Sequence, residues 1–466
     1  MIKRIPAFII SIIIVLAAAV PATAAPQPDL NLTAQTAILV EQTTGRQLYG
    51  KDVDKRMYPA SMTKILTALV AMDYLKPDEF IVLGDELHET PAGSSIAYLA
   101  PGETITAQNL LRGLLIMSGN DAGCAIAYCV AKKAKGVSDM KYDDAEALFA
   151  DLMNKKAAAL GATGSHFTNP HGFQDENHYS TAHDIALFSR AFMQIPLLKD
   201  IVDEQTFNEK GAGDNPPAGA MNIEHDWKTH NQLIMTDDVN YYTYANGIKT
   251  GFTNEAGNCV AASAEKDGVG LICVVFNSPD PGLWNDSKAL LNYGFDNFAF
   301  ADVQKSGELL ERAVISRPQL GMPAALDVLS SGSFRDFFNK ADVARIKRDI
   351  TYDAAFLDQS AAPAPSGAAV LQAPIVKGQV LGKVSYSLDG QVIYTAAAVA
   401  AANVDKRTLG SDFLYYLDMV KTHLLIKDAI PFWAGGAAIL AALIIILTVR
   451  HKRKKRNQGF SMYRWR

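Results

Sequence analysis

The sequence predicts an α/β fold. We expect an α+β sandwich with a mainly antiparallel sheet and a helical domain, followed by a small β-rich domain and a C-terminal transmembrane helix. In residues 37–276, strand-like segments stand on either side of a helical block. Residues 302–400 alternate between apolar and polar side chains around the hairpin turn Asp389-Gly390. Residues 430–449 carry no charge and are long enough to cross a bilayer.

The first 25 residues match a secretory signal peptide. Lys3 and Arg4 precede the apolar stretch 7–20, and the small residues 22–24 supply a cleavage site near Ala25. The stretch is shorter than the roughly 20 residues that a membrane span needs. This favours a cleaved signal over a membrane anchor.

The first domain divides into strands and helices by its periodicity. The elements expected, in chain order, are two strands within 37–48, a helix over 61–75, a helical block over 109–164, a strand pair over 247–276 and a returning helix over 287–294. The turn Thr44-Gly45 separates the first two strands. The helix over 61–75 is apolar nearly all round, which is typical of a helix buried in a core.

The C-terminal third predicts a membrane-attached protein. An amphipathic stretch, 404–428, leads into the apolar span, and the basic run RHKRKKR follows directly, which marks the cytoplasmic side. The expected divisions are a signal peptide (1–25), a serine peptidase domain (26–301), a β-rich domain (302–400), an amphipathic linker (401–429), a transmembrane helix (430–449) and a basic cytoplasmic tail (450–466).

Charge argues against a nucleic-acid partner. Of the 44 Lys and Arg residues, two lie in the signal and eight in the tail, which leaves 34 in the middle of the chain against all 49 Asp and Glu residues. The exported part is therefore strongly acidic, with a net charge of −15. An acidic domain repels the phosphate backbone.

The four cysteines are expected to be free and buried. Cys124 and Cys129 are five apart in a helical pattern and point to different faces. Cys259 and Cys273 lie on two strands around the tight turn 266–268, whose register does not put them opposite each other. No spacing of Cys and His suits a metal.

Three short motifs occur in a fixed order. They are Ser61-Met-Thr-Lys64, then Ser118-Gly-Asn120, then Lys249-Thr-Gly251. Two other serines stand three before a lysine, at 138 and 263, but neither precedes the Ser-Gly-Asn motif. This trio in this order is typical of serine acyl-transfer enzymes that react with β-lactams.

Each motif residue has a physical task. Ser61 and Lys64 share a helix face, so the lysine can serve as the base that a weak serine nucleophile needs. Burial and a second cation, Lys249, would lower the pKa of Lys64 enough for it to accept a proton.

The remaining motif residues would bind substrate and move protons. Ser118 can relay a proton toward the leaving amine, and Asn120 can hold the base and a substrate amide. Lys249 and Thr250 suit a terminal carboxylate. The backbone N–H of Phe252 and that of the nucleophile can form an oxyanion hole.

The chain resembles the D-alanyl-D-alanine carboxypeptidases, the low-molecular-mass penicillin-binding proteins. Beyond the trio, the resemblance rests on AILVEQTTGRQLY, GSSIAYLAPGE, TNPHGFQDENHYSTAHDIA and LLNYGFDNF, and it covers residues 35–298. It implies a penicillin-binding/β-lactamase-like fold. It also implies removal of the terminal D-alanine from peptidoglycan stem pentapeptides, covalent inhibition by β-lactam antibiotics, and no cofactor. The roles implied are nucleophile for Ser61, base for Lys64, and second and third motifs for Ser118, Asn120, Lys249, Thr250 and Gly251.

The chain departs from the family pattern in two features, and three alternative functions remain open. Phe252 follows the third motif where some relatives have histidine, and the C-terminal span replaces a peripheral helix. A class A β-lactamase would need a glutamate in an E-x-x-L-N loop, and the nearest stretch, 151–154, lacks it. A D,D-endopeptidase and a non-catalytic penicillin-binding sensor share the trio.

Polar residues near the motifs are expected to be structural. We interpret His171 as a loop histidine, Asp121 as a capping or structural carboxylate, and Glu103 as the start of a helix. Ser94 and Ser95 are expected near the cleft without an assigned role.

Overall fold

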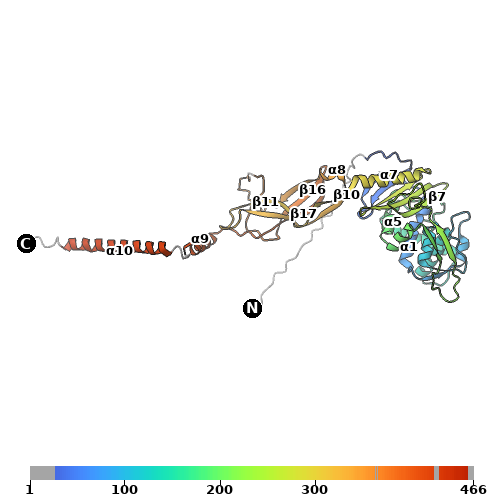
Figure 1. Ribbon diagram of the computed structural model, residues 1–466, viewed down its shortest axis with the longest axis horizontal. Coiled ribbons are helices and arrows are strands. Elements are labelled where there is room, and N and C mark those ends of the chain that lie inside the picture. The colour runs from blue at the N-terminus through green and yellow to red at the C-terminus, as the bar shows by residue number, and fades with distance from the viewer. Residues whose placement is uncertain (1–26, 363, 365, 425–429, 460–466) are drawn as a thin grey trace, which may run out of the picture. The chain divides into compact units, whose positions relative to one another are not determined.

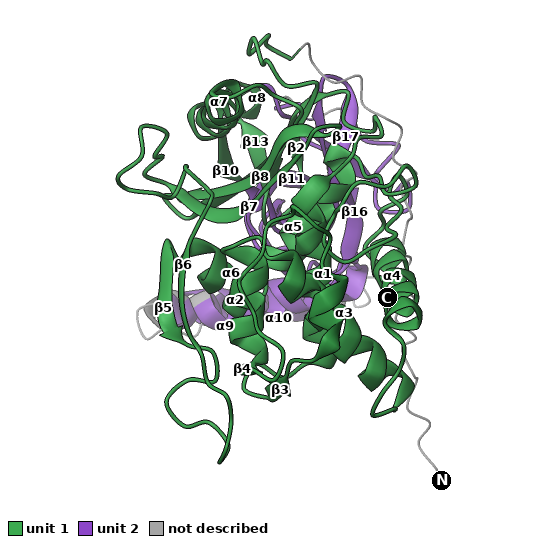
Figure 2. Cartoon of the chain, turned by 90° about the vertical axis from the view of Figure 1, so that its right-hand side faces the viewer, with its two compact units in different colours: residues 1–301, 336–344 green, residues 302–335, 345–466 purple. Residues whose placement is uncertain are grey.

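The computed structural model describes residues 27–362, 364, 366–424 and 430–459. The predicted signal peptide, 1–25, lies outside these residues. The chain forms two compact units, coloured separately in Figure 2. Unit 1 ends at Ala301 and also takes in residues 336–344, and unit 2 contains the remainder.

Unit 1 contains most of the helices. Its elements are β1 (Thr36–Glu41), β2 (Gln47–Lys51), the 3₁₀ helix η1 (Ala60–Met62), α1 (Thr63–Tyr74), β3 (Phe80–Val82), the 3₁₀ helix η2 (Asp85–Glu89), β4 (Thr104–Thr106), α2 (Ala107–Leu115), α3 (Asn120–Lys135), α4 (Tyr142–Ala159), α5 (Ala182–Met193), α6 (Pro196–Asp203), β5 (Thr206–Lys210), β6 (Glu224–Lys228), β7 (Ala245–Thr253), β8 (Gly257–Lys266), β9 (Val269–Phe276) and α7 (Gly282–Asn297). Next come β10 (Phe298–Gln304), β13 (Phe334–Asn339) and α8 (Lys340–Val343), which lie at the boundaries of this unit.

The main sheet of unit 1 is antiparallel and is buried on both faces. Its strand order is β2-β1-β9-β8-β7, so β7 is an edge strand. Along β1, Ile38 and Val40 face one apolar core, while Ala37 and Leu39 face a second. Figure 1 shows α7 on one side of this sheet and α1 and α5 on the other. The predicted sandwich of helices and antiparallel sheet is therefore confirmed.

Several element boundaries differ from the expectation. The helix expected from Ser61 begins as the 3₁₀ turn η1 and becomes α-helical at Thr63. The expected returning helix is longer and spans α7. The prediction that Glu103 begins a helix is wrong. Helix α2 begins at Ala107, after Thr106, whose hydroxyl accepts the Asn109 N–H.

Glu103 is instead a buried tertiary contact. Its side chain is fully buried, and Oε1 lies 2.6 Å from Nε2 of His225 on β6. Its other oxygen accepts the N–H of Ala100. The carboxylate therefore ties the loop after η2 to the β5–β6 hairpin.

The core of unit 1 extends to a late segment of the chain. Phe337 is fully buried in the second apolar core, and its ring stacks on Phe298 with centroids 6.0 Å apart. Strands β10 and β13 pair in a two-stranded sheet. Residues 336–344 thus complete a core whose other members end near Ala301.

Unit 2 contains a six-stranded sheet and two helices. Its elements are β11 (Leu309–Ser316), β12 (Ala325–Ser330), β14 (Lys347–Tyr352), β15 (Val370–Gln372), β16 (Val380–Leu388), β17 (Gln391–Ala400), α9 (Leu409–Leu424) and α10 (Ile430–Gly459). The strand order is β14-β16-β17-β12-β11-β15. The predicted turn Asp389-Gly390 joins β16 to β17, with positive φ at both residues, as a two-residue hairpin requires. The β-rich character expected of this region is confirmed.

One helix among the described residues is long and apolar enough to cross a membrane. It is the segment Trp433–Arg453 of α10, with a mean hydropathy of 2.0 over its most apolar window. The helix continues past the expected span into the basic run.

Candidate active site

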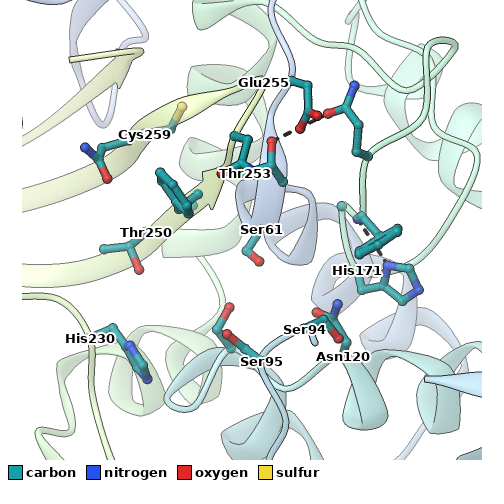
Figure 3. Close-up of a pocket in the computed structure, with 18 of the residues that line it drawn as sticks. Ser61, Ser94, Ser95, Asn120, His171, His230, Thr250, Thr253, Glu255 and Cys259 are labelled. Atoms are coloured by element: carbon teal, nitrogen blue, oxygen red, sulfur yellow. Dashed lines mark hydrogen bonds between the residues drawn. The ribbon is translucent and has the colours of Figure 1, made fainter. Parts of the chain in front are cut away.

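A cavity of about 560 Å³ opens between the edge strand β7 and the helical part of unit 1. Six of the residues predicted from the motifs line it: Ser61, Ser118, Asn120, Thr250, Gly251 and Phe252. The other two, Lys64 and Lys249, are buried beside them. Figure 3 shows Ser61 in the middle of the cavity, with Thr250 on one side and His171 on the other.

Ser61, the predicted nucleophile, is held on a tight and strained turn. Ala60, directly before Ser61, has a φ of 45°, in the left-handed region that non-glycine residues rarely adopt. Two glycines allow close approach to this turn. A Cβ at Gly172 (φ 82°) would lie 1.8 Å from the carbonyl oxygen of Ala60, and one at Gly251 would lie 3.1 Å from the nitrogen of Ser61. The backbone around the serine is therefore enclosed by a loop and a strand.

Lys64 is surrounded by three hydrogen-bond partners. Its Nζ lies 2.9 Å from Ser61 Oγ, 2.7 Å from Asn120 Oδ1 and 2.8 Å from the carbonyl oxygen of His171. The last two oxygens can only accept. A neutral amine has two N–H bonds, which both go to these acceptors, so its lone pair faces the serine hydroxyl. The lone pair of a neutral Lys64 therefore points toward Ser61, as the predicted proton transfer requires.

The electrostatic environment favours a neutral Lys64. Complete burial lowers its pKa well below the ordinary value, and the positive charge of Lys249 lowers the pKa further, against a partial opposing effect of Asp121. Burial also lowers the pKa of Lys249, to about 7. The expectation that Lys249 acts as a second cation on Lys64 agrees with this environment.

The second motif stands at the start of α3. Ser118 has a φ of 58°, and Asn120 begins the helix, where its N–H donates to the carbonyl oxygen of Ser95. The carboxylate of Asp121 accepts the N–H groups of Ala97, Leu99 and Ala122 at 2.8–3.2 Å. Asp121 is therefore a structural carboxylate, as expected, which holds the loop before the second motif against α3.

The third motif lies on the free edge of the sheet. Lys249 is 2% exposed and donates to the carbonyl oxygen of Thr250 at 2.9 Å. Since side chains alternate along a strand, Thr250 and Phe252 point to one face and Lys249 to the other. The lysine thus supports the site from inside, while the threonine hydroxyl is available to a ligand.

Several residues of the cavity had no sequence signal. Gln174, His230 and Glu255 line it, from loops and from the tip of the β7–β8 hairpin. Burial lowers the pKa of His230, and Lys249 adds to the decrease. Ser94 and Ser95 also line the cavity, as expected. Loop residues have no periodicity, so only a known fold could have placed them.

The histidines of the loop after α4 are structural. His171 contributes its carbonyl oxygen to Lys64, and its own pKa is well below the ordinary value because of burial and the nearby lysine. His178 is buried with its pKa lowered to about 4, and its Nε2 lies 2.8 Å from the hydroxyl of Thr63. Burial therefore disfavours the charged form of both rings.

All four cysteines are free, as predicted. Burial raises the pKa of Cys124 to about 11 and that of each of the other three thiols to about 12. Cys129 alone is partly exposed, which corrects the expectation of four fully buried thiols. Among the described residues, no group of three or more His, Cys, Asp or Glu side chains could hold a metal ion.

Family models match two parts of the chain. Residues 21–280 match the model described as D-alanyl-D-alanine carboxypeptidase. Residues 358–406 match the model described as penicillin-binding protein 5, C-terminal domain. The first match covers more than half of the chain.

Curated relatives and solved structures agree with these matches. The chain is 28% identical over 395 residues to the D-alanyl-D-alanine carboxypeptidase DacF of Bacillus subtilis, covering 82% of this chain and 88% of that protein. It is 30% identical to DacA of Haemophilus influenzae, covering 78% and 84%. The structure of penicillin binding protein 5 from Haemophilus influenzae aligns with a TM-score of 0.57 and 26% identity, covering 82% of this chain and all of that one. A point mutant of the Streptomyces K15 DD-transpeptidase aligns with a TM-score of 0.51 and 28% identity, over 58% of this chain and all of that one.

Proposed function

The chain belongs to the D-alanyl-D-alanine carboxypeptidase family of serine peptidases, and from this membership we propose how its own residues perform the reaction. The enzyme is a serine hydrolase that removes the terminal D-alanine from a peptidoglycan stem pentapeptide. The observation that carries the residue assignment is the set of three contacts around Lys64.

Acylation begins with proton transfer from Ser61 to the neutral amine of Lys64. The serine oxygen attacks the carbonyl carbon of the penultimate D-alanine, and the N–H groups of Ser61 and Phe252 stabilise the developing oxyanion. Ser118 donates its hydroxyl proton to the leaving amine and takes a proton from the Lys64 ammonium, so that the amide bond breaks, D-alanine departs and Lys64 is neutral again. Thr250 binds its carboxylate before it leaves, with the buried Lys249 behind the strand.

Deacylation repeats these steps with water. The neutral Lys64 takes a proton from a water molecule, and the hydroxide attacks the ester on Ser61. The bond between the acyl carbon and Ser61 Oγ breaks, and Lys64 returns the proton to the serine oxygen. Penicillin is attacked in the same way, since its strained amide takes the place of the peptide bond. The reaction needs no cofactor.

Release of D-alanine tests the assignment. The detergent-solubilised chain is incubated with a short peptide ending in D-Ala-D-Ala, with Ser61→Ala in parallel. We expect the wild type to release D-alanine and the variant to release none, while circular dichroism of the two proteins coincides. If the variant releases D-alanine, or if the folded wild type releases none, the assignment of Ser61 as nucleophile is wrong.

We infer a membrane-anchored arrangement with the catalytic unit outside the cytoplasm. Its support is the apolar helix Trp433–Arg453, followed by a basic run. The six predicted divisions, from signal peptide (1–25) to tail (450–466), are part of this proposal. A C-terminal epitope tag should be cut by protease in inside-out vesicles and protected in intact spheroplasts; the opposite pattern would reverse the orientation.

A further inference from the structure

Phe252 is an unusual residue for its position. Its side chain is 61% exposed at the cavity, and it belongs to neither apolar core. Leaving a phenylalanine in water forgoes the favourable transfer that burial would give. The chain therefore keeps a large apolar surface at the opening of a site whose other β7 residues are polar or small.

The position of Phe252 on β7 places its ring close to the leaving residue of the substrate. Phe252 and Thr250 point to the same face of β7, about 6.6 Å apart along the strand. In the proposed reaction, Thr250 holds the carboxylate of the leaving residue and the Phe252 N–H holds the scissile carbonyl oxygen. The leaving residue thus lies along the segment between them, and its side chain is within reach of the Phe252 ring.

The cavity beside this segment has apolar side chains among its mostly polar lining residues and holds little positive charge. Leu283 and Trp284, in the first turn of α7, line the same cavity. No Lys or Arg is among the described residues that line it. The nearby cation, Lys249, is buried, already donates to the Thr250 carbonyl oxygen, and has its pKa lowered to about 7. The carboxylate of a ligand therefore contributes less to the binding free energy here than it would beside an exposed cation. Apolar contacts of the ligand contribute a correspondingly larger share.

We propose that Phe252 is a specificity residue that forms, with Leu283 and Trp284, an apolar subsite for leaving residues larger than alanine. This inference rests on the proposed function and names its substrate class: D-Ala-D-Xaa peptides whose Xaa side chain has several carbon atoms. A residue that cross-links one stem to another has such a chain. The bond broken is still the D-Ala–Xaa amide, and the proton goes to the Xaa amine.

Two peptides that differ only in the last residue test the subsite. The detergent-solubilised full chain is assayed for kcat/KM on a peptide ending in D-Ala-D-Ala and on its D-Ala-D-Leu counterpart. This constant includes acylation, the step in which the leaving residue departs. We expect the wild type to cleave the D-Leu peptide at least as well as the D-Ala peptide. A tenfold preference for D-Ala in the wild type would overturn the proposal without any variant.

Variants locate the effect at Phe252. Phe252→Ala should lower the D-Leu to D-Ala ratio about 5–10-fold, the range expected for loss of a few methylene contacts, while Phe252→Leu should stay near the wild-type ratio. Phe173→Ala is the matched control, since Phe173 is a 43% exposed phenylalanine that lines the same cavity from another loop. Its ratio should not change.

Acylation by a fluorescent penicillin shows that each variant is folded and reactive. An unchanged ratio in acylated Phe252→Ala, or an equal fall in Phe173→Ala, would overturn the subsite alone. A wild type that cleaves neither peptide and is not acylated by penicillin would overturn the proposed function, and the subsite with it.

Discussion

Replacing Lys249 by methionine should make the protein more stable while removing a residue of the site. Burial lowers the pKa of Lys249 from 10.5 to about 7, which measures how strongly the folded state disfavours its charge. At about 1.4 kcal/mol for each tenfold change, this corresponds to an upper limit of about 5 kcal/mol. Methionine also loses the hydrogen bond to the Thr250 carbonyl oxygen, which costs about 1–2 kcal/mol. The expected net gain in the free energy of unfolding is about 3 kcal/mol.

The gain should depend on pH in a defined direction. The folded-state pKa lies below the unfolded-state value, so between about pH 7 and pH 10.5 the unfolded chain binds one more proton than the folded chain. Raising the pH through this range therefore stabilises the wild type. The advantage of Lys249→Met is full below pH 7 and disappears toward pH 10.5.

Calorimetry of the solubilised chain at pH 6.5 and pH 10 measures both effects. The relevant transition is the one that penicillin shifts upward in the wild type. At pH 6.5 it should lie roughly 6–12 °C higher in Lys249→Met, at about 2–4 °C per kcal/mol for a unit of this size. A variant that melts below the wild type at pH 6.5, or keeps an equal advantage at pH 10, would refute the reasoning.

Two further substitutions probe the geometry around the nucleophile. Asn120→Ala removes one of the two acceptors that orient Lys64, so acylation by penicillin in stopped flow should slow about 10–100-fold, and a change under twofold would contradict the proposed orientation. Gly172→Ala places a Cβ against the Ala60 carbonyl and should abolish acylation and lower the urea midpoint. Gly161→Ala is its control, because Gly161 has the same positive φ (85°) but no atom within 4 Å of the added Cβ, and it should cost only about 1 kcal/mol. Equal effects of the two would rule out the steric argument.

The sequence predicted the parts of the site that follow local periodicity. Ser61 and Lys64 share a helix face, and Lys249 to Phe252 alternate on a strand, so their relations could be worked out from spacing alone. The pairing of β1 with β9 links residues 230 to 240 positions apart. The order of strands and helices predicted a mainly antiparallel sheet, but it did not predict which strands pair in it.

Contacts made by single polar residues could not be predicted from local periodicity. Glu103 was expected at a helix start because acids favour that position. Its buried partner, His225, is 122 residues away and no periodic pattern connects the two. His230 enters the cavity from an irregular loop for a similar reason. Such contacts depend on where loops end in space, which is set by the whole fold.

The late segment 336–344 has a consequence for the order of events during synthesis. In the proposed arrangement the chain is exported from its N-terminus, and domains generally fold in that order. Phe337 fills part of the core of unit 1, yet it follows Ala301 by 36 residues, most of which belong to unit 2. When the last long helix of the peptidase unit, α7, has emerged, the unit still lacks residues 336–344 and therefore cannot finish folding. Activity outside the membrane should begin only after a stretch of the next unit has also crossed, which ties the timing of catalysis to translocation of the downstream chain.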